Sequence, residues 1–394
     1  MKRAALVIAS LALAACTADV YTPRPKLEPH PLDPTNPENP AAPGVKKVTI
    51  PIADARAQVP AAEALAFARS VAPMLVGRAL TPAERSELDA GGAVALRTML
   101  ERWVEEPAFA ETARDFISVK LKASGASANL DGSLPGNLAA YLVKNKRPHA
   151  ELITSPVCRD RMGTAIACDS GAPFGAGVLT TRVFLANNAG RFNLKRARTV
   201  LMTFACSDYP LTQALQPSLQ RAQLIELFQN DKPPDGTSGA FGNGHACYTC
   251  HSQFGAHAQP FVKFDSDGRW QADATGLQLP GGEQGRSTGK LFTSHMADEA
   301  AAKSEASQYF GQPVADLAGE AKVLSEHPLY LECAVRSVFG YVLSLSGSEA
   351  NALPYDVISE IVSEAKSREP EPSFARLVVE AFSHPSVVAA KRSP

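Results

Sequence analysis

The sequence lacks an excess of charge, a long apolar run in its main part and any internal repeat. Its 39 Lys and Arg residues nearly balance its 40 Asp and Glu residues, for a formal net charge of −1. This balance argues against nucleic acid, or any other strongly charged molecule, as the partner. Beyond the N-terminal segment, no apolar run is long enough to cross a bilayer as a helix. The 394 residues are enough for two or three domains with sizeable cores.

Residues 1–15 have the pattern of a secretory signal peptide. Lys2 and Arg3 supply a positive start, and an apolar run of small residues follows. The letters LAAC that end at Cys16 resemble the lipobox of bacterial lipoproteins. In that family a diacylglycerol is attached to the cysteine, which becomes the new N-terminus. The alternative is an ordinary signal peptide cleaved after Ala15, with no role for the cysteine.

Residues 16–56 are expected to form a membrane tether, with lipidated Cys16 at its start. Eight prolines lie within residues 17–44. Such a segment cannot build a packed core and favours extended polyproline II geometry. We therefore predict a protein of the cell envelope, held by lipid at the periplasmic or outer-membrane face.

The remaining sequence predicts a mainly α, multi-domain protein with long irregular loops. The alanine-rich segment from Ala61 has helical spacing and closes at Gly77. In the letters TPAERSEL, Thr81 is the expected N-cap, Pro82 the first helical residue and Glu84 the end of a capping box. Further helices are predicted at 93–105, 107–122, 137–145, 192–206, 329–345, 354–366 and 373–382.

Residues 245–251, HACYTCH, contain the one motif with strong chemical meaning. Two cysteines two residues apart, followed by histidine, form the attachment signature of c-type haem. One helical turn presents both sulfurs to the porphyrin edge and the imidazole to its centre. We predict that Cys247 and Cys250 bind one covalent haem c and that His251 is the proximal iron ligand.

Zinc is the main alternative at this motif. A structural zinc site needs four ligands, usually in two spaced pairs, and the sequence has no second CxxC. Only His245 or His257 lies near enough in sequence to complete such a site. A thioredoxin-type redox pair needs a strand-helix setting, whereas this motif follows a glycine-rich segment. An inert Cys247–Cys250 disulfide is sterically allowed. Export of the chain favours haem, because c-type attachment takes place outside the cytoplasmic membrane.

The second axial ligand of the iron has several candidates. Methionine would raise the reduction potential and a second histidine would lower it. Met296 is the first candidate, because it lies some tens of residues after the motif. His295, His257 and Met202 are the others. An open sixth position also fits the sequence.

The four remaining cysteines are an even number, as disulfide bonding requires. They allow three pairings, and exported proteins tend to oxidise their thiols. We expect Cys158 to pair with Cys168, and Cys206 with Cys333. Four buried free thiols are the alternative.

The chain resembles the planctomycete-type secreted cytochromes, in which a CxxCH module lies between helical domains. After the motif the resemblance includes Phe264-Asp265 and Gly268-Arg269-Trp270, and flanking segments extend it over most of residues 61–388. This chain departs from the family at Gly255-Ala256, where members usually have Asp-Pro. The resemblance implies haem binding and electron transfer without naming a donor or acceptor.

Motif and resemblance together give a domain plan and three candidate functions. We expect an N-terminal helical domain at 57–150, a cytochrome c-like haem module at 151–300 and a C-terminal helical domain at 301–394. The leading function is a lipid-anchored electron carrier that meets redox partner proteins. The second is a haem-dependent oxidase or peroxidase, or the haem subunit of an envelope degradative complex, with His257 or His295 as acid-base group. The third is a non-redox adaptor with a structural haem.

Overall fold

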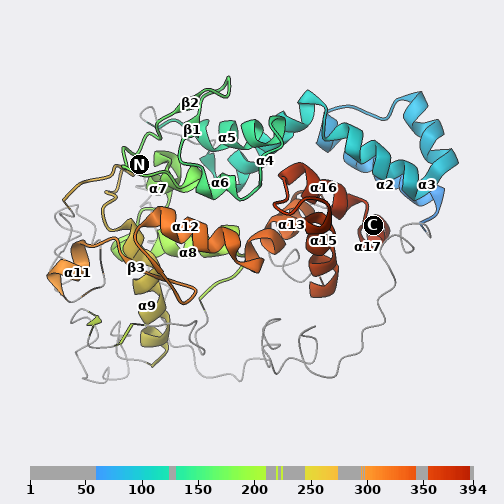
Figure 1. The fold of residues 1–394 in the computed structure, drawn as a ribbon. Helices are drawn as coiled ribbons and strands as arrows, with labels where there is room; N and C mark the ends of the chain where they lie inside the picture. The colour runs from blue at the N-terminus through green and yellow to red at the C-terminus, as the bar shows by residue number, and fades with distance from the viewer. Residues whose placement is uncertain are drawn as a thin grey trace, which may run out of the picture.

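The structure, a computed structural model, is mainly α, which confirms the predicted fold class. Short two-stranded hairpins are the only sheets in the described part of the chain (Figure 1). For residues 245–251 only the backbone is described. The structure describes residues 59–123, 130–209, 219–220, 223–224, 245–273, 294, 296, 298–342 and 354–390.

The N-terminal helices begin and end where the sequence indicates. Gly77 ends the first of them in the left-handed conformation, at φ 66°. Thr81 and Glu84 form the predicted capping box. The segments expected at 82–88 and 93–105 form one helix with a kink at Gly92, whose φ is 52° and ψ −129°. These helices are α2 (Ala61–Val76), α3 (Pro82–Trp103), α4 (Pro107–Lys120) and α5 (Leu134–Lys144).

Glu84 stabilises the start of α3 through several donors. Its carboxylate accepts hydrogen bonds from Arg78 at 2.8 and 3.0 Å, from Trp103 Nε1 at 2.8 Å and from the Thr81 backbone N–H at 2.7 Å. Burial alone would raise the pKa of this carboxyl, but the hydrogen bonds outweigh burial and lower the pKa to about 2. The ionised form is therefore the one that the fold stabilises.

We expect Glu84→Gln to remove a stabilisation of about 2 kcal/mol at neutral pH, allowing for partial solvent screening. Because the folded pKa lies below the unfolded one, the wild-type advantage is complete above pH 5. It declines as the pH falls through the interval between about 4.5 and 2. Urea unfolding of both forms at several pH values measures this. A constant difference between the two at pH 7 and pH 3 would contradict it.

The middle of the chain alternates short elements with loops. They are α6 (Glu151–Thr154), β1 (Cys158–Arg159), β2 (Ala165–Ile166), η2 (Gly177–Thr180), α7 (Arg182–Asn187), η3 (Arg191–Asn193), α8 (Leu194–Phe204), α9 (His245–Ala258) and η6 (Gln259–Phe261). Strands β1 and β2 are antiparallel, with Cys158 opposite Ile166. The sequence did not predict this hairpin, because two-residue strands leave no alternating pattern.

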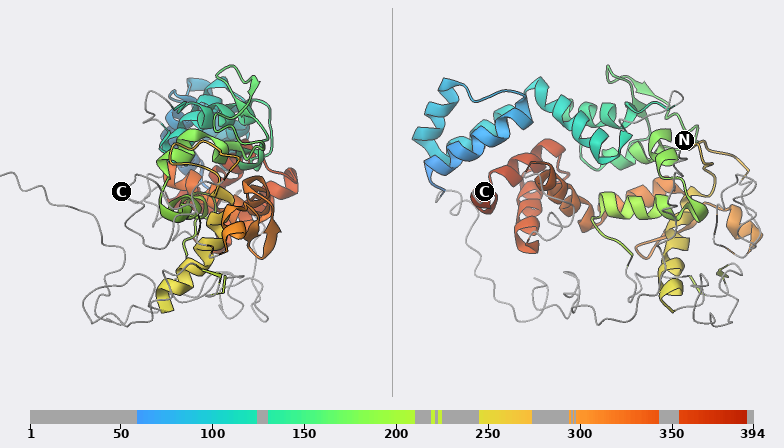
Figure 2. Two further views of the ribbon diagram at one scale, coloured as in Figure 1. Left: turned by 90° about the vertical axis from the view of Figure 1, so that its left-hand side faces the viewer. Right: turned by 180° about the vertical axis from the view of Figure 1, so that it is seen from behind.

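The C-terminal part is again mainly helical. Its elements are α11 (Glu299–Lys303), β3 (Ser307–Tyr309), β4 (Gln312–Val314), α12 (Leu317–Glu326), α13 (Pro328–Val342), α15 (Tyr355–Arg368), α16 (Phe374–Phe382) and α17 (Pro385–Ala390). In the β3–β4 hairpin, Ser307 pairs with Val314. Helix α12 packs against α6, α13 and the β3–β4 hairpin (Figure 1 and Figure 2).

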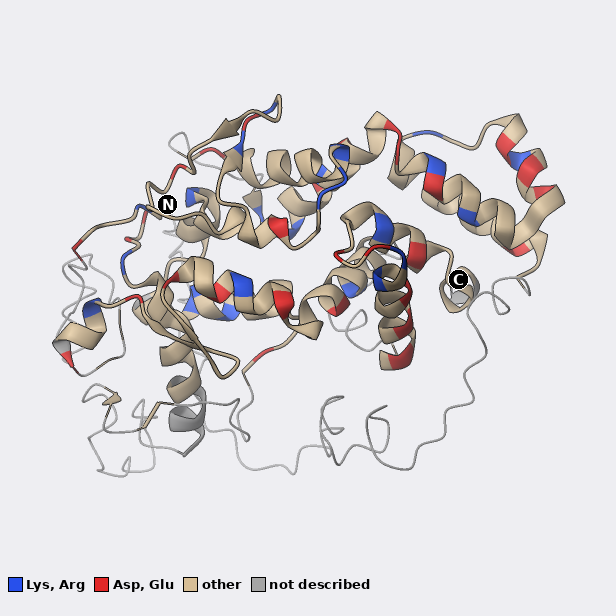
Figure 3. Cartoon of the chain, in the orientation of Figure 1, with Lys and Arg blue, Asp and Glu red and all other residues tan. Residues whose placement is uncertain are grey.

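Buried side chains connect the two ends of the described chain. Phe109 stacks on Phe374 with ring centroids 6.1 Å apart, and Phe67 meets Phe382 edge-on at 5.9 Å. Most buried apolar residues belong to one cluster that crosses the predicted boundaries at 150 and 300. Charges of both signs are interspersed along the described elements (Figure 3). None of the described helices is long and apolar enough to cross a membrane.

Candidate functional site

Helix α9 carries the CxxCH motif in its first two turns. Residues 247, 250 and 251 are related by i, i+3 and i+4, so the helical backbone brings them to one face. The same stripe continues through Phe254 to His257. The motif therefore shares its helix face with residues of the protein interior.

The C-terminal half of α9 is held firmly in the core. Ser252 and Gln253 are each only 1% exposed, and the Ser307 hydroxyl donates to the Ala256 carbonyl at 2.6 Å. Just after the helix, the Gln259 amide donates to the Ala301 carbonyl at 2.7 Å and accepts from the Ser294 hydroxyl at 2.8 Å. In Figure 1, α9 extends outward from this anchored end. These contacts fix the direction in which the motif-bearing turns point.

His257 is built into the interior beside this anchor. Its Nδ1 and the Tyr209 hydroxyl are hydrogen-bonded at 2.7 Å, and its ring lies 4.3 Å from that of Tyr309. Tyr209 also contacts Phe254, with ring centroids 3.9 Å apart. Burial lowers the pKa of His257 to about 3. The imidazole is thus neutral at physiological pH, and its tautomer decides whether Nδ1 or the Tyr209 hydroxyl is the donor.

We expect Tyr209→Phe to destabilise the fold by about 1–2 kcal/mol, because it leaves the buried Nδ1 of His257 without its hydrogen-bond partner. The pKa of His257 should remain well below 6.5, since burial, its cause, is unchanged. Thermal unfolding and a histidine NMR titration check the two parts. Tyr141→Phe, at a half-buried tyrosine far from α9, is the matched control. A Tyr209 variant as stable as this control would contradict the expectation.

The segment after α9 is clamped by Arg196 of α8. This guanidinium is 1% exposed and donates to the carbonyls of Leu185 at 2.9 Å, Phe264 at 2.8 Å and Asp265 at 2.5 Å, and to the Asn193 side chain at 2.8 Å. Burial lowers its pKa to about 10. Our sequence analysis assigned no role to Arg196, although a basic residue on the apolar stripe of a helix indicates a buried, hydrogen-bonded side chain.

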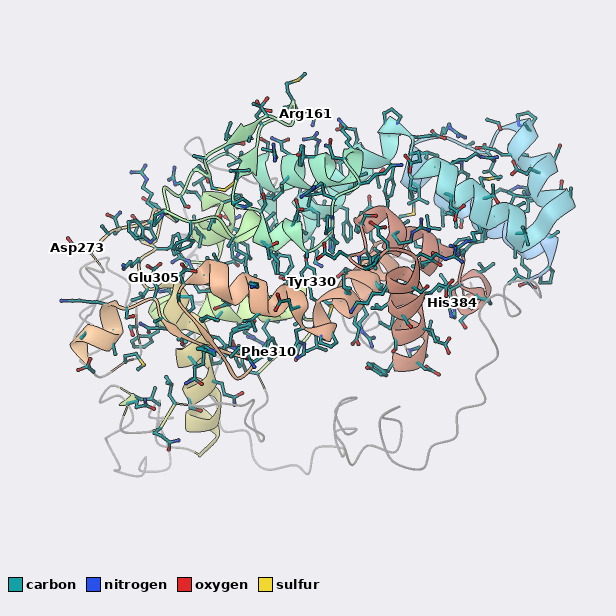
Figure 4. All side chains as sticks on the ribbon, viewed as in Figure 1. Arg161, Asp273, Glu305, Phe310, Tyr330 and His384 are labelled. Atoms are coloured by element: carbon teal, nitrogen blue, oxygen red, sulfur yellow. A yellow bond between two sulfur atoms is a disulfide. The ribbon has the colours of Figure 1, made fainter. Side chains whose placement is uncertain are left out.

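Residues 263–271 fold back on themselves beyond this clamp. The Asp265 N–H donates to the Arg269 carbonyl at 2.9 Å, and the Gln271 N–H donates to the Lys263 carbonyl at 2.8 Å. Trp270 donates through Nε1 to Glu305 at 3.2 Å; Glu305 is labelled in Figure 4. The Phe-Asp and Gly-Arg-Trp residues that we singled out thus form one compact turn next to the α9 anchor.

The candidates for the second axial position are scattered. Met296 lines a groove of about 380 Å³ beside Ala256 and Gln259, at the anchored end of α9. Ala256 is five residues beyond position 251, roughly 7.5 Å along a helix. Met202 on α8 is 50% exposed, and His257 is held by Tyr209 as described. Cys16 and His295 lie outside the described residues.

The structure contains both of the disulfides that we expected. Cys158 and Cys168 close the β1–β2 hairpin over a separation of 10 residues. Cys206 and Cys333 join the segment after α8 to α13 over a separation of 127 residues. This second bond encloses the whole CxxCH motif. These two bonds use four of the seven cysteines in the sequence.

Among the side chains that the structure describes, no group of three or more His, Cys, Asp or Glu is placed to hold a metal ion. The motif side chains are not part of that set. Comparison with protein-family models, curated proteins and solved structures found no match to this chain. The argument for function therefore comes from the residues and their geometry.

Proposed function

We propose that this protein is a c-type cytochrome that carries one covalent haem for electron transfer. The observation that carries the proposal is the placement of positions 247, 250 and 251 on one face of a helical backbone. A haem held by two thioether bonds and a proximal imidazole needs that arrangement. The donor set also fits: two thiols and an imidazole are the groups that react with vinyl carbons and ligate iron.

The three residues of the motif would have different roles in binding the haem. Cys247 and Cys250 would hold the porphyrin covalently, and His251 would ligate the iron. When bound, the haem supplies a one-electron redox centre. The protein's own contribution is orientation, since the anchored half of α9 fixes the helix, and exclusion of water by the buried residues beside it.

The disulfides support an extracytoplasmic location for this chemistry. Disulfides persist in oxidising compartments, where thioether attachment of haem also takes place. Together with the signal-like N-terminus and Cys16, they favour a lipid-anchored protein of the cell envelope. A tether to the membrane raises the effective concentration of the haem at redox partner proteins.

The test is expression of the full chain with c-type maturation proteins, followed by a pyridine haemochrome spectrum and intact mass. We expect the intact mass to include one haem. The pyridine haemochrome spectrum should be that of haem attached through two thioether bonds. In the absorption spectrum of the native protein, recorded without pyridine, six-coordinate low-spin iron would favour the carrier. High-spin iron that binds peroxide would instead favour the oxidase or peroxidase alternative. Protein that carries zinc, or no added mass, would overturn the proposal.

A further inference from the structure

Two buried polar side chains near the anchored end of α9 have no hydrogen-bond partner among the described residues. Glu320 of α12 is 0% exposed, and neither of its carboxyl oxygens has a hydrogen bond within this set. The Tyr309 hydroxyl of β3 is likewise buried and unbonded there. Leaving such groups unpaired lowers the stability of the fold, so a chain that keeps them gains something else from them.

These groups belong to one buried cluster with the residues of α9. The Tyr309 ring contacts His257 at 4.3 Å, and His257 is hydrogen-bonded to Tyr209 at 2.7 Å. The charge of Glu320 acts on both tyrosines, and helps to raise the pKa of each after burial itself. We call Tyr209, His257, Tyr309 and Glu320 the buried polar cluster. Phe310, which flanks it, is labelled in Figure 4.

No positive charge among the described residues stabilises the carboxylate of Glu320. Burial alone raises its pKa well above the usual value, which favours the neutral, protonated carboxyl. On its own helix, Lys322 and Glu326 are exposed. The ionisable groups on the elements around it are Tyr309 on β3, His257 on α9, Tyr209 after α8, Glu151 on α6, His327 before α13, and Tyr330, Glu332, Arg336 and Tyr341 on α13.

Those groups provide no counter-charge to Glu320. Glu151 is paired with Arg147 at 2.5 Å, and the Tyr330 hydroxyl donates to the His149 carbonyl at 2.9 Å. Glu332 and Arg336 interact with each other. A new positive charge nearby would therefore be the main influence able to favour ionisation of Glu320.

We propose that Glu320 is a proton site whose protonation is coupled to the redox state of the haem carried by α9. This inference rests on the proposed function. The stripe of α9 that bears the motif leads through Phe254 to His257, so the haem side of the helix adjoins the buried polar cluster. Charges interact strongly across such a dry interior, because little water screens them.

The coupled step balances in electrons and protons. On oxidation, one electron passes from the haem site to an acceptor protein, and the site gains one positive charge. The O–H bond of Glu320 then breaks, the proton leaves to solvent and the carboxylate compensates the new charge. On reduction both particles return. The predicted consequence is a reduction potential that falls as pH rises.

The test measures the equilibrium reduction potential against pH for the haem-loaded wild type, Glu320→Gln and Glu326→Gln. Glu326 is the matched control, since it is an exposed acid on the same helix. We expect Glu320→Gln to lose most of the pH dependence and Glu326→Gln to keep it. Equal pH dependence in all three would overturn the inference, and would assign any slope to the haem's own carboxyl groups.

A second measurement covers the case in which Glu320→Gln does not fold. Infrared difference spectra of the wild type, oxidised minus reduced, should show a protonated carboxyl band that disappears on oxidation. Tyr309→Phe should shift this band, because that ring adjoins Glu320. Haem-loaded protein without a redox-linked carboxyl band would overturn the inference but not the proposed function. Protein without haem would overturn the proposed function itself.

Discussion

Replacing Cys247 and Cys250 together by serine should abolish covalent haem attachment, because serine hydroxyls do not form thioether bonds to vinyl groups. Each single variant should keep one thioether bond but give a much lower yield of protein with covalently attached haem. Intact mass and a pyridine haemochrome spectrum measure the result. In His251→Ala, we expect the haem mass to persist while the absorption spectrum of the native protein, recorded without pyridine, shows loss of an axial nitrogen ligand.

The matched control for this prediction is the Cys158→Ser and Cys168→Ser pair, which removes two cysteines and their disulfide elsewhere. It should retain one haem per chain. Haem mass in the Cys247 and Cys250 double variant would refute attachment at α9. Loss of haem in the control would point to misfolding as the common cause, and unfolding curves of each variant separate these results.

Removing the Cys206–Cys333 disulfide should have the largest effect on stability. It closes a loop with a separation of 127 residues, and the chain-entropy model gives about 5 kcal/mol for a loop of that length. We expect Cys206→Ala with Cys333→Ala to unfold at much lower urea concentration than the wild type. The m-value should also rise, because the unfolded chain is less compact.

The short disulfide offers a matched comparison. Cys158 and Cys168 are separated by 10 residues, and for a loop of that length the same model gives about 2.7 kcal/mol. The Cys158→Ala and Cys168→Ala pair should therefore lose clearly less stability than the long-loop pair. Equal losses in the two pairs would contradict the loop-length argument and point to local packing as the source of the effect.

Local signals in the sequence predicted much of the helical structure. Thr81, Pro82 and Glu84 form a cap within four residues, so the start of α3 follows from its own letters. The end of α2 follows from Gly77 in the same way. Helices α4, α5, α8, α15 and α16 all lie where apolar periodicity placed them. The spacing of the CxxCH motif likewise predicted a helical turn, and α9 provides one.

Features that depend on distant partners did not follow from the sequence. Nothing near Phe109 indicates that it stacks on Phe374, and nothing near Tyr209 indicates its bond to His257. Helix α12 was missed, although Asp316 caps it through the Gly319 N–H at 2.9 Å. Glu320 occupies the apolar stripe of that helix, which is the one local signal of its burial.

The Cys206–Cys333 bond has a consequence for the order of maturation. In the export that we propose, the N-terminal part of the chain emerges first, so Cys158 would meet Cys168 early, whereas Cys206 would have to wait for Cys333. In that interval Cys206 is a free thiol alongside Cys247 and Cys250, and closing the shorter loop to either of them costs less entropy than the native closure. Haem attachment to Cys247 and Cys250 before Cys333 emerges would block both competing thiols. The cofactor would then act as a protecting group, and Cys333 would be the partner left for Cys206.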